Sequence, residues 1–300
     1  KYEREDLKTE LQRYKNILSN MRRKENIDMM SAVSMEEITV VEELINDGAP
    51  INLKNKVGSS ALMRAVKAEN LEITQALLAG GADVDIRDKN GQTALMFAIE
   101  QGNMEIVKLL LEHGANIDIK STNGDSPLIK AVAAPQASPE IVQELLDHGA
   151  NIDIQDNRGQ TPLMLASIFD YTVLAEMLLD NGADVTIEDN NREKAMEMAE
   201  PPIKGWLKSH TNTWNNLVTA IAKKELKVVK SQIDGGANIN RKDSVGDTPL
   251  MKAVIGGDGE IVQVLLSHSK NIDIQSRNGN SPLIRATIEE NTEIIEALLA

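Results

Sequence analysis

The sequence predicts an all-α repeat solenoid, in which similar helix pairs stack and each pair contacts only its neighbours. A glycine–alanine pair recurs at nearly constant spacing, a helix-start signature recurs in phase with it, and apolar residues follow both at helical spacing. The composition agrees with this fold class. Of the residues, 41% are hydrophobic but only 2% are aromatic, which suits many small helix contacts better than one large core.

The repeat unit is clearest in the stretch GQTALMFAIEQGNMEIVKLLLEHGANIDI, which begins at Gly91. Leu95 and Ile99 lie one helical turn apart, and Ile106 and Leu110 repeat this spacing after a Gly-Asn pair. Two short helices are therefore expected in each unit. Because helices this short are marginal alone in water, the unit needs copies of itself as neighbours.

The Gly-Ala pairs set the register of the repeats, and the successive steps between them are 33, 33, 35, 33 and 54. The pairs are Gly48-Ala49, Gly81-Ala82, Gly114-Ala115, Gly149-Ala150, Gly182-Ala183 and Gly236-Ala237. The step of 35 places two extra residues near Pro135 and Pro139, in the turn between two helices. The step of 54 implies one shortened repeat. A further step of 33 from Gly236 reaches Ser269, which replaces the glycine of the pair. We expect backbone strain at this serine, because glycine is favoured in a left-handed helix cap.

A helix-start signature occurs six times. It reads SALMRA from Ser60, TALMFA from Thr93, SPLIKA from Ser126, TPLMLA from Thr161, TPLMKA from Thr248 and SPLIRA from Ser281. The Thr or Ser supplies an N-cap oxygen, and the Pro that follows in four copies suits the first helical position.

This period and this signature resemble the ankyrin repeat, whose unit of about 33 residues is a β-turn finger followed by two antiparallel helices. The resemblance covers about residues 25–300. The histidine of the family's T-P-L-H-x-A signature is Met or Ile in all six copies. This substitution puts in question the polar link that the histidine makes to the next turn, but not the fold.

Three parts are predicted along the chain. Residues 1–24 form an N-terminal amphipathic helix, and residues 25–212 form a first ankyrin block of six repeats, the last of which is a shortened closing cap. Residues 213–300 form a second block with a starting cap and two repeats, cut within a helix, so the full-length protein is expected to continue.

The two starting caps lack a finger and align with each other at a constant offset. This offset pairs Ala32 with Ala220 and Gly48 with Gly236, which indicates that a whole block was duplicated. In the closing cap between the blocks, the prolines at 201 and 202 are expected to end one helix, and a brief second helix is expected around Leu207.

The N-terminal segment of residues 2–21 has a narrow apolar seam with charge between its members. The seam consists of Leu7, Leu11, Tyr14, Leu18 and Met21. Such a helix covers the exposed end of the first repeat in one interpretation. In the other it is a coiled-coil stub that joins two copies into a homodimer through residues 2–21. Three heptads are too few to choose between them.

Charge and composition exclude several functions. The net charge of −14 argues against a nucleic-acid groove or an anionic membrane surface, although residues 1–24 alone are basic. No apolar run approaches the roughly 20 residues of a membrane helix, so no membrane insertion is expected. Cysteine is absent, which excludes disulfides, a thiolate nucleophile and cysteine-bound zinc. A cytoplasmic location is favoured, and secretion stays open because the chain begins at Lys1 rather than Met.

No catalytic or metal site is indicated, so we expect no enzyme activity and no cofactor. The glycines recur singly and form no phosphate-binding loop. His113, His148 and His268 occupy the same position in three repeats and are interpreted as polar residues at helix C-termini. The Asp and Asn residues before each finger lack the spacing of an EF-hand, and we interpret them as turn formers.

In the ankyrin family, partners bind the finger tips and the exposed ends of the first helices on the concave side. By alignment, the resemblance implies partner contacts from Lys56, Val57, Lys67, Lys89, Asn90, Glu100, Gln101, Asn157, Arg158, Ile168, Phe169, Tyr171, Val245 and Ile255. Most of these residues are polar. Ile168, Phe169 and Tyr171 are bulky and form the leading candidate for a binding hot spot. The alternative is that they tuck under the neighbouring finger.

The sequence therefore predicts a non-catalytic scaffold that binds a protein partner of unknown identity on its concave surface. The acidic body favours a basic partner. Two alternatives stay open: a regulatory, targeting or inhibitor region of a larger system whose catalytic part lies outside residues 1–300, and an architectural spacer.

Overall fold

The computed structural model describes residues 28–300 except 136, 244, 270, 271 and 277, and the side chains of residues 202, 206 and 210 are likewise not described. The chain divides into two compact units, Lys1–Asn123 and Gly124–Ala300. The predicted N-terminal helix of residues 2–21, with its two interpretations as a cap and as a homodimer contact, lies outside the described residues.

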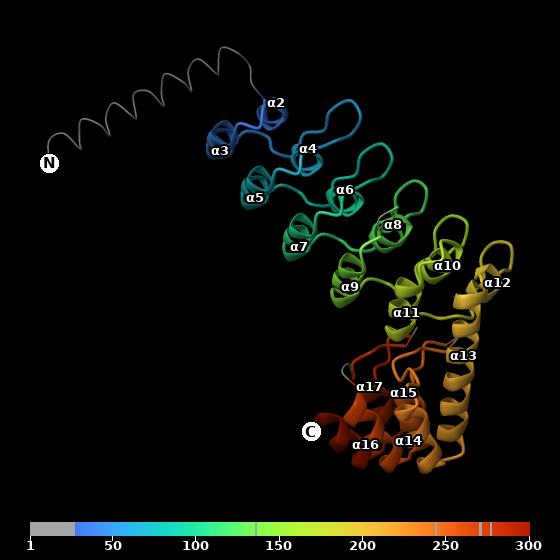
Figure 1. Ribbon diagram of the computed structural model, residues 1–300. Coiled ribbons are helices and arrows are strands. Elements are labelled where there is room, and N and C mark those ends of the chain that lie inside the picture. The colour runs from blue at the N-terminus through green and yellow to red at the C-terminus, as the bar shows by residue number, and fades with distance from the viewer. Residues whose placement is uncertain (1–27, 136, 244, 270–271, 277) are drawn as a thin grey trace. The chain divides into compact units, whose positions relative to one another are not determined.

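The described part of the first unit contains three helix pairs joined by finger loops (Figure 1). Its helices are α2 (Met29–Ser34), α3 (Ile38–Asn46), α4 (Ala61–Lys67), α5 (Leu71–Ala79), α6 (Ala94–Gln101) and α7 (Met104–Glu112). The first helices α2, α4 and α6 pack in one layer, and the second helices α3, α5 and α7 pack in another. Each pair therefore contacts the next pair through both layers.

The second unit repeats this arrangement and adds one long helix. Its helices are α8 (Pro127–Ala133), α9 (Pro139–Asp147), α10 (Pro162–Ile168), α11 (Thr172–Asp180), α12 (Ala195–Met198), α13 (Pro201–Ala222), α14 (Leu226–Asp234), α15 (Pro249–Gly256), α16 (Gly259–His268), α17 (Pro282–Ile288) and α18 (Thr292–Leu299). No strand occurs in the described part of either unit, which confirms the predicted fold class.

Local chemistry starts and ends the helices as predicted. All six signature hydroxyls accept a hydrogen bond from the backbone N–H three residues later, at 3.2–3.4 Å. The glycines of all six Gly-Ala pairs have positive φ. The paired leucines at the ends of the second helices are buried or half-buried, and Leu77 and Leu110 are fully buried.

Two local expectations are wrong. Ser269 has φ −87° and ψ 127°, so it leaves the left-handed cap conformation and is not strained there. The brief helix expected around Leu207 is instead α13, which has 22 residues and runs through the predicted junction at residue 212. Residues 206–222 contain no proline or glycine, and Leu207, Leu217 and Ile221 are buried along the helix, so nothing ends it earlier.

The residues that replace the signature histidine are part of the core. Met63, Met96, Ile129, Met164 and Met251 are at most 1% exposed, and only Ile284, in the last pair, is open to solvent. Other side chains link one finger to the next. These links run from Lys54 Nζ to Arg87 O, from Arg87 Nη2 to Lys120 O and from Gln155 Nε2 to Glu188 O, at 2.7–3.2 Å.

Consecutive fingers also share backbone hydrogen bonds. The N–H of Thr122 donates to Asn90 O at 2.8 Å, beside Gly91, and the N–H of Lys89 donates to Val57 O at 3.1 Å in the same way. Gly91 has a φ of +71°, and a Cβ added there would lie 2.9 Å from Thr122 N. A side chain at this position would therefore push apart the two fingers that the bond joins.

Replacing Gly91 with alanine is expected to lower the free energy of unfolding by about 2 to 4 kcal/mol, because backbone strain adds to the overlap with the next finger. Gly102 is a matched control, since it has the same φ of +71° but open space around an added Cβ. Gly102→Ala is expected to cost about 1 kcal/mol. Urea unfolding followed by circular dichroism measures both, and equal losses would contradict a role for the close approach of the fingers.

Candidate functional site

Within α2–α7 of the first unit, and within each of the stacks α8–α12 and α13–α18 of the second, the finger tips and the last turns of the first helices lie on one side, which we call the finger face (Figure 1). All predicted contact residues except Tyr171, which is half-buried, are exposed on it. The exposed residues are Lys56, Val57, Lys67, Lys89, Asn90, Glu100, Gln101, Asn157, Arg158, Ile168, Phe169, Val245 and Ile255. Stacking brings equivalent positions of successive repeats side by side within each stack, and Val245 and Ile255 belong to the later stack, which begins with α13.

On the first unit the finger face is polar and internally bonded. The Lys67 ammonium lies over the Phe97 ring, with Nζ 3.6 Å from the ring centroid. Gln101 Nε2 donates to Lys67 O at 2.9 Å, which ties α6 to the end of α4. Such an arrangement holds the cationic side chain of Lys67 in one place.

The fifth repeat carries an apolar patch on the finger face, formed by Ile168, Phe169 and Tyr171. Ile168 is 42% exposed and Phe169 is 45% exposed, so they do not tuck under a finger. The rings of Phe169 and Tyr171 lie 5.7 Å apart, and the Tyr171 hydroxyl donates to Ala134 O at 3.4 Å. Ala134 begins the longer α8–α9 connection, which is where the two extra residues of the longer repeat were predicted.

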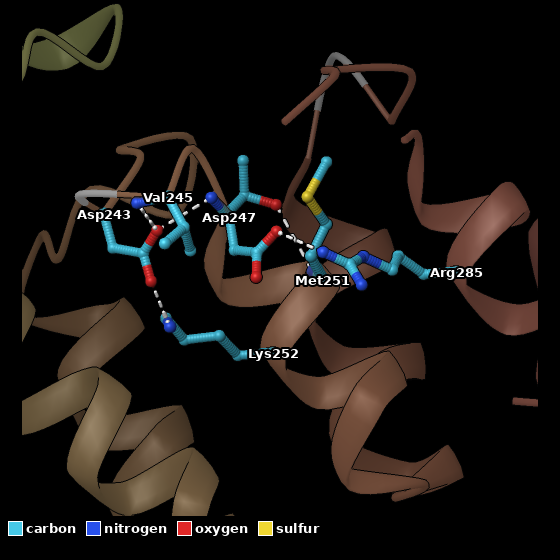
Figure 2. Close-up of polar contacts among 7 residues, drawn as sticks. Asp243, Val245, Asp247, Met251, Lys252 and Arg285 are labelled. Atoms are coloured by element: carbon cyan, nitrogen blue, oxygen red, sulfur yellow. Dashed lines mark hydrogen bonds and ion pairs between the residues drawn. The ribbon is translucent and has the colours of Figure 1, made fainter. Parts of the chain in front are cut away.

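In the second unit the finger before α15 is held to the helices by two ion pairs (Figure 2). Asp243 accepts hydrogen bonds from the backbone N–H groups of Val245 and Asp247 and pairs with Lys252. Arg285 Nη2 lies 3.4 Å from Asp247 Oδ1. Val245 and Ile255 stay exposed beside these pairs, at 53% and 42%.

The charge of Asp243 is stabilised by these contacts. Burial alone would raise the pKa of this carboxyl group, but the hydrogen bonds from Lys252 and from the backbone of Asp247 and Val245 hold its pKa below the ordinary value. The carboxylate therefore stays ionised at neutral pH and fixes both the turn and the lysine.

Sequence reasoning missed the residue at the fifth position of the signature. This position holds Arg64, Lys130, Lys252 and Arg285 in four repeats. Lys130 pairs with Asp125 at 3.8 Å, as Lys252 and Arg285 pair with aspartates of their own unit. The sequence could have indicated this position. Arg64 lies three residues before the predicted contact residue Lys67 on the same helix, and residues three apart share a helix face.

The histidines and the turn residues behave as predicted. Nδ1 of His113, His148 and His268 lies 2.8–2.9 Å from a carbonyl oxygen four residues earlier, at the C-terminal end of the helix. Asp88 and Asp156 accept hydrogen bonds from backbone N–H groups two and four residues later, and so they close the finger turns. In the described part of the chain, no three His, Asp or Glu residues are grouped to hold a metal ion.

Stacked helix pairs with protruding fingers define a helical-repeat protein. The sequence profile of ankyrin repeats matches the chain in three copies, over residues 29–122, 114–189 and 217–300. The chain belongs to the ankyrin-repeat family, whose repeats are generally protein–protein interaction modules without enzyme activity.

A search of curated proteins returned no match. None of the described helices is long and apolar enough to cross a membrane.

Replacing Asp243 with asparagine is expected to remove the ion pair with Lys252 but keep the turn, since Asn55 accepts the same backbone bonds in the first unit. At pH 7 the loss should be about 0.5 to 1 kcal/mol after allowance for solvent screening. A lowered folded-state pKa stabilises the fold above the unfolded-state pKa and stops doing so as the pH falls through the folded-state pKa.

The stabilities of the native protein and of Asp243→Asn should therefore converge as the pH falls from 7 to about 2. Urea unfolding across this range measures the difference. A deficit that stays the same at acid pH would show that the variant damages the turn and not the ion pair.

Proposed function

We propose that the chain is a non-catalytic scaffold that binds a protein partner on its finger face, with the patch of Ile168, Phe169 and Tyr171 as the hot spot. The observation that carries the proposal is the exposure of Ile168 and Phe169 at the end of α10. Exposed aliphatic and aromatic groups on a rigid support are the residues that dominate binding energy in protein interfaces.

The patch is held in place before any partner arrives. Asp170 has a φ of +55°, so the chain turns sharply between Phe169 and Tyr171, and Tyr171 lies directly before the first residue of α11. The Tyr171 hydroxyl contact with Ala134 joins the patch to the preceding repeat. Little side-chain freedom is left to lose on binding at the half-buried Tyr171, which favours affinity.

The partner surface that matches this patch is apolar at its centre. A basic rim on the partner suits the strongly acidic chain, because complementary charge speeds encounter at low salt. Affinity itself is expected to depend mainly on the apolar contact, and therefore to change little with ionic strength.

The first experiment identifies the partner by photo-crosslinking from residue 168 in the native cell. The second measures the affinity of that partner for the double variant Ile168→Ala, Phe169→Ala, which is expected to fall by about 30-fold or more. Val173→Ala is the matched control, since Val173 is 60% exposed but lies at the start of the second helix α11.

The control variant is expected to bind like the native protein, and both variants are expected to keep their thermal unfolding midpoints because the changed side chains are exposed. Unchanged affinity in the double variant would refute the hot spot. Equal losses in the double variant and in Val173→Ala would place the contact elsewhere on the repeat.

A further inference from the structure

We propose that the first unit holds a separate binding site, a basic groove for an acidic peptide segment. The groove has a volume of about 400 Å³ and lies between the first finger and the helices α2 and α4. Asn55, Val57 and Ser59 of the finger line one wall, and Arg64 and Lys67 of α4 line the other. It is distinct from the apolar patch of the fifth repeat, which belongs to the second unit.

The groove is positively charged although the chain as a whole has a net charge of −14. Arg64 and Lys67 are exposed on its helix side, and Glu36 is the one acidic residue among the described residues that line it. Lys56 and Lys89 stand at neighbouring finger tips, because the N–H of Lys89 bonds to Val57 O. Among the described residues that line the groove, the two cations of α4 are therefore opposed by a single carboxylate.

Equivalent cations elsewhere on the chain are neutralised within their own unit. The offset that aligns the two starting caps also pairs Arg64 with Lys252 and Asn55 with Asp243, and Lys252 forms an ion pair with Asp243. The first block therefore has a neutral asparagine where the second block has the partner aspartate. Consistent with this, the Arg64 side chain makes no ion pair with any described residue.

The finger position before the signature shows the same substitution. Ser59 stands where Asp125 and Asp247 stand before their signatures, and those aspartates pair with Lys130 and Arg285.

The last repeat also lacks both acidic residues in its own finger, but there Arg285 reaches back to Asp247 of the preceding finger. No finger precedes α2 among the described residues, so the described part of the chain offers Arg64 no carboxylate of that kind. An external carboxylate can take the place of these internal counter-charges, and a guanidinium binds a carboxylate through two parallel hydrogen bonds.

The rest of the groove selects a peptide over other polyanions. Val57 is 60% exposed and offers an apolar contact to an aliphatic side chain of the bound segment. Phe97 is only 8% exposed and lies under Lys67, so it is covered and cannot stack on a nucleic-acid base. The acidic body also repels a long polyanion, whereas a short acidic segment contacts only the groove.

The test uses the full chain and a fluorescent peptide of roughly twelve residues with Asp and Glu around a central Leu pair. Fluorescence anisotropy is expected to show binding that weakens as salt is added, and binding on the order of tenfold weaker when Asn and Gln replace the acids. The variants Arg64→Glu and Asn55→Asp are each expected to weaken binding by about tenfold, the second because it supplies an internal partner for Arg64.

Lys230→Glu is the matched control for Arg64→Glu, because Lys230 is exposed on α14 in the second unit and its change of charge is the same. Lys230→Glu should leave affinity unchanged. The proposal is overturned if the acidic peptide does not bind, if the amide peptide binds equally well, or if Lys230→Glu weakens binding as much as Arg64→Glu. Equal competition by single-stranded DNA would overturn the choice of a peptide.

These outcomes do not depend on the proposed hot spot, since Ile168 and Phe169 are unchanged in every variant. Thermal unfolding of Arg64→Glu and Asn55→Asp, whose changed side chains are exposed, confirms that lost binding reflects the groove and not the fold.

Discussion

The close approach of successive fingers is the constraint on which both surfaces depend. The bond from Thr122 N–H to Asn90 O, and its equivalent from Asn190 N–H to Arg158 O, join neighbouring fingers only because glycine stands beside each contact. Side chains at equivalent finger positions therefore keep a fixed spacing from one repeat to the next.

Features that depend on neighbours within a few residues could be predicted from the sequence. The N-cap role of Ser60 and the left-handed backbone of Gly48 are of this kind, and both are confirmed. The strain expected at Ser269 was wrong because the residue takes an extended conformation, which avoids the steric cost of the left-handed region while its N–H still donates to Leu266 O. The extent of α13 was missed because burial of Leu217 depends on packing across the repeat.

The sequence predicted where the surface residues lie, but not which of them are exposed to solvent or paired with another side chain. Alignment placed Ile168 and Lys67 on the finger face, yet it could not show that one lies open to solvent and the other rests on the Phe97 ring. Whether the guanidinium of Arg64 forms an ion pair could not be predicted either, since this depends on which finger residue lies opposite it. Whether an equivalent cation is paired or free follows from three-dimensional contact, as the pairing of Lys252 with Asp243 shows.

Repetition allows the core and the surface to vary separately. Met63 and Met96 fill the same buried position in successive repeats, and changing them would disturb the stacking of all their neighbours. Asn55 and Asp243, by contrast, close equivalent turns with the same backbone bonds, but only Asp243 forms an ion pair with the cation of the helix that follows, among the described residues. A repeat can therefore gain or lose a charged groove by substitutions in its finger, at little cost to the fold that positions it.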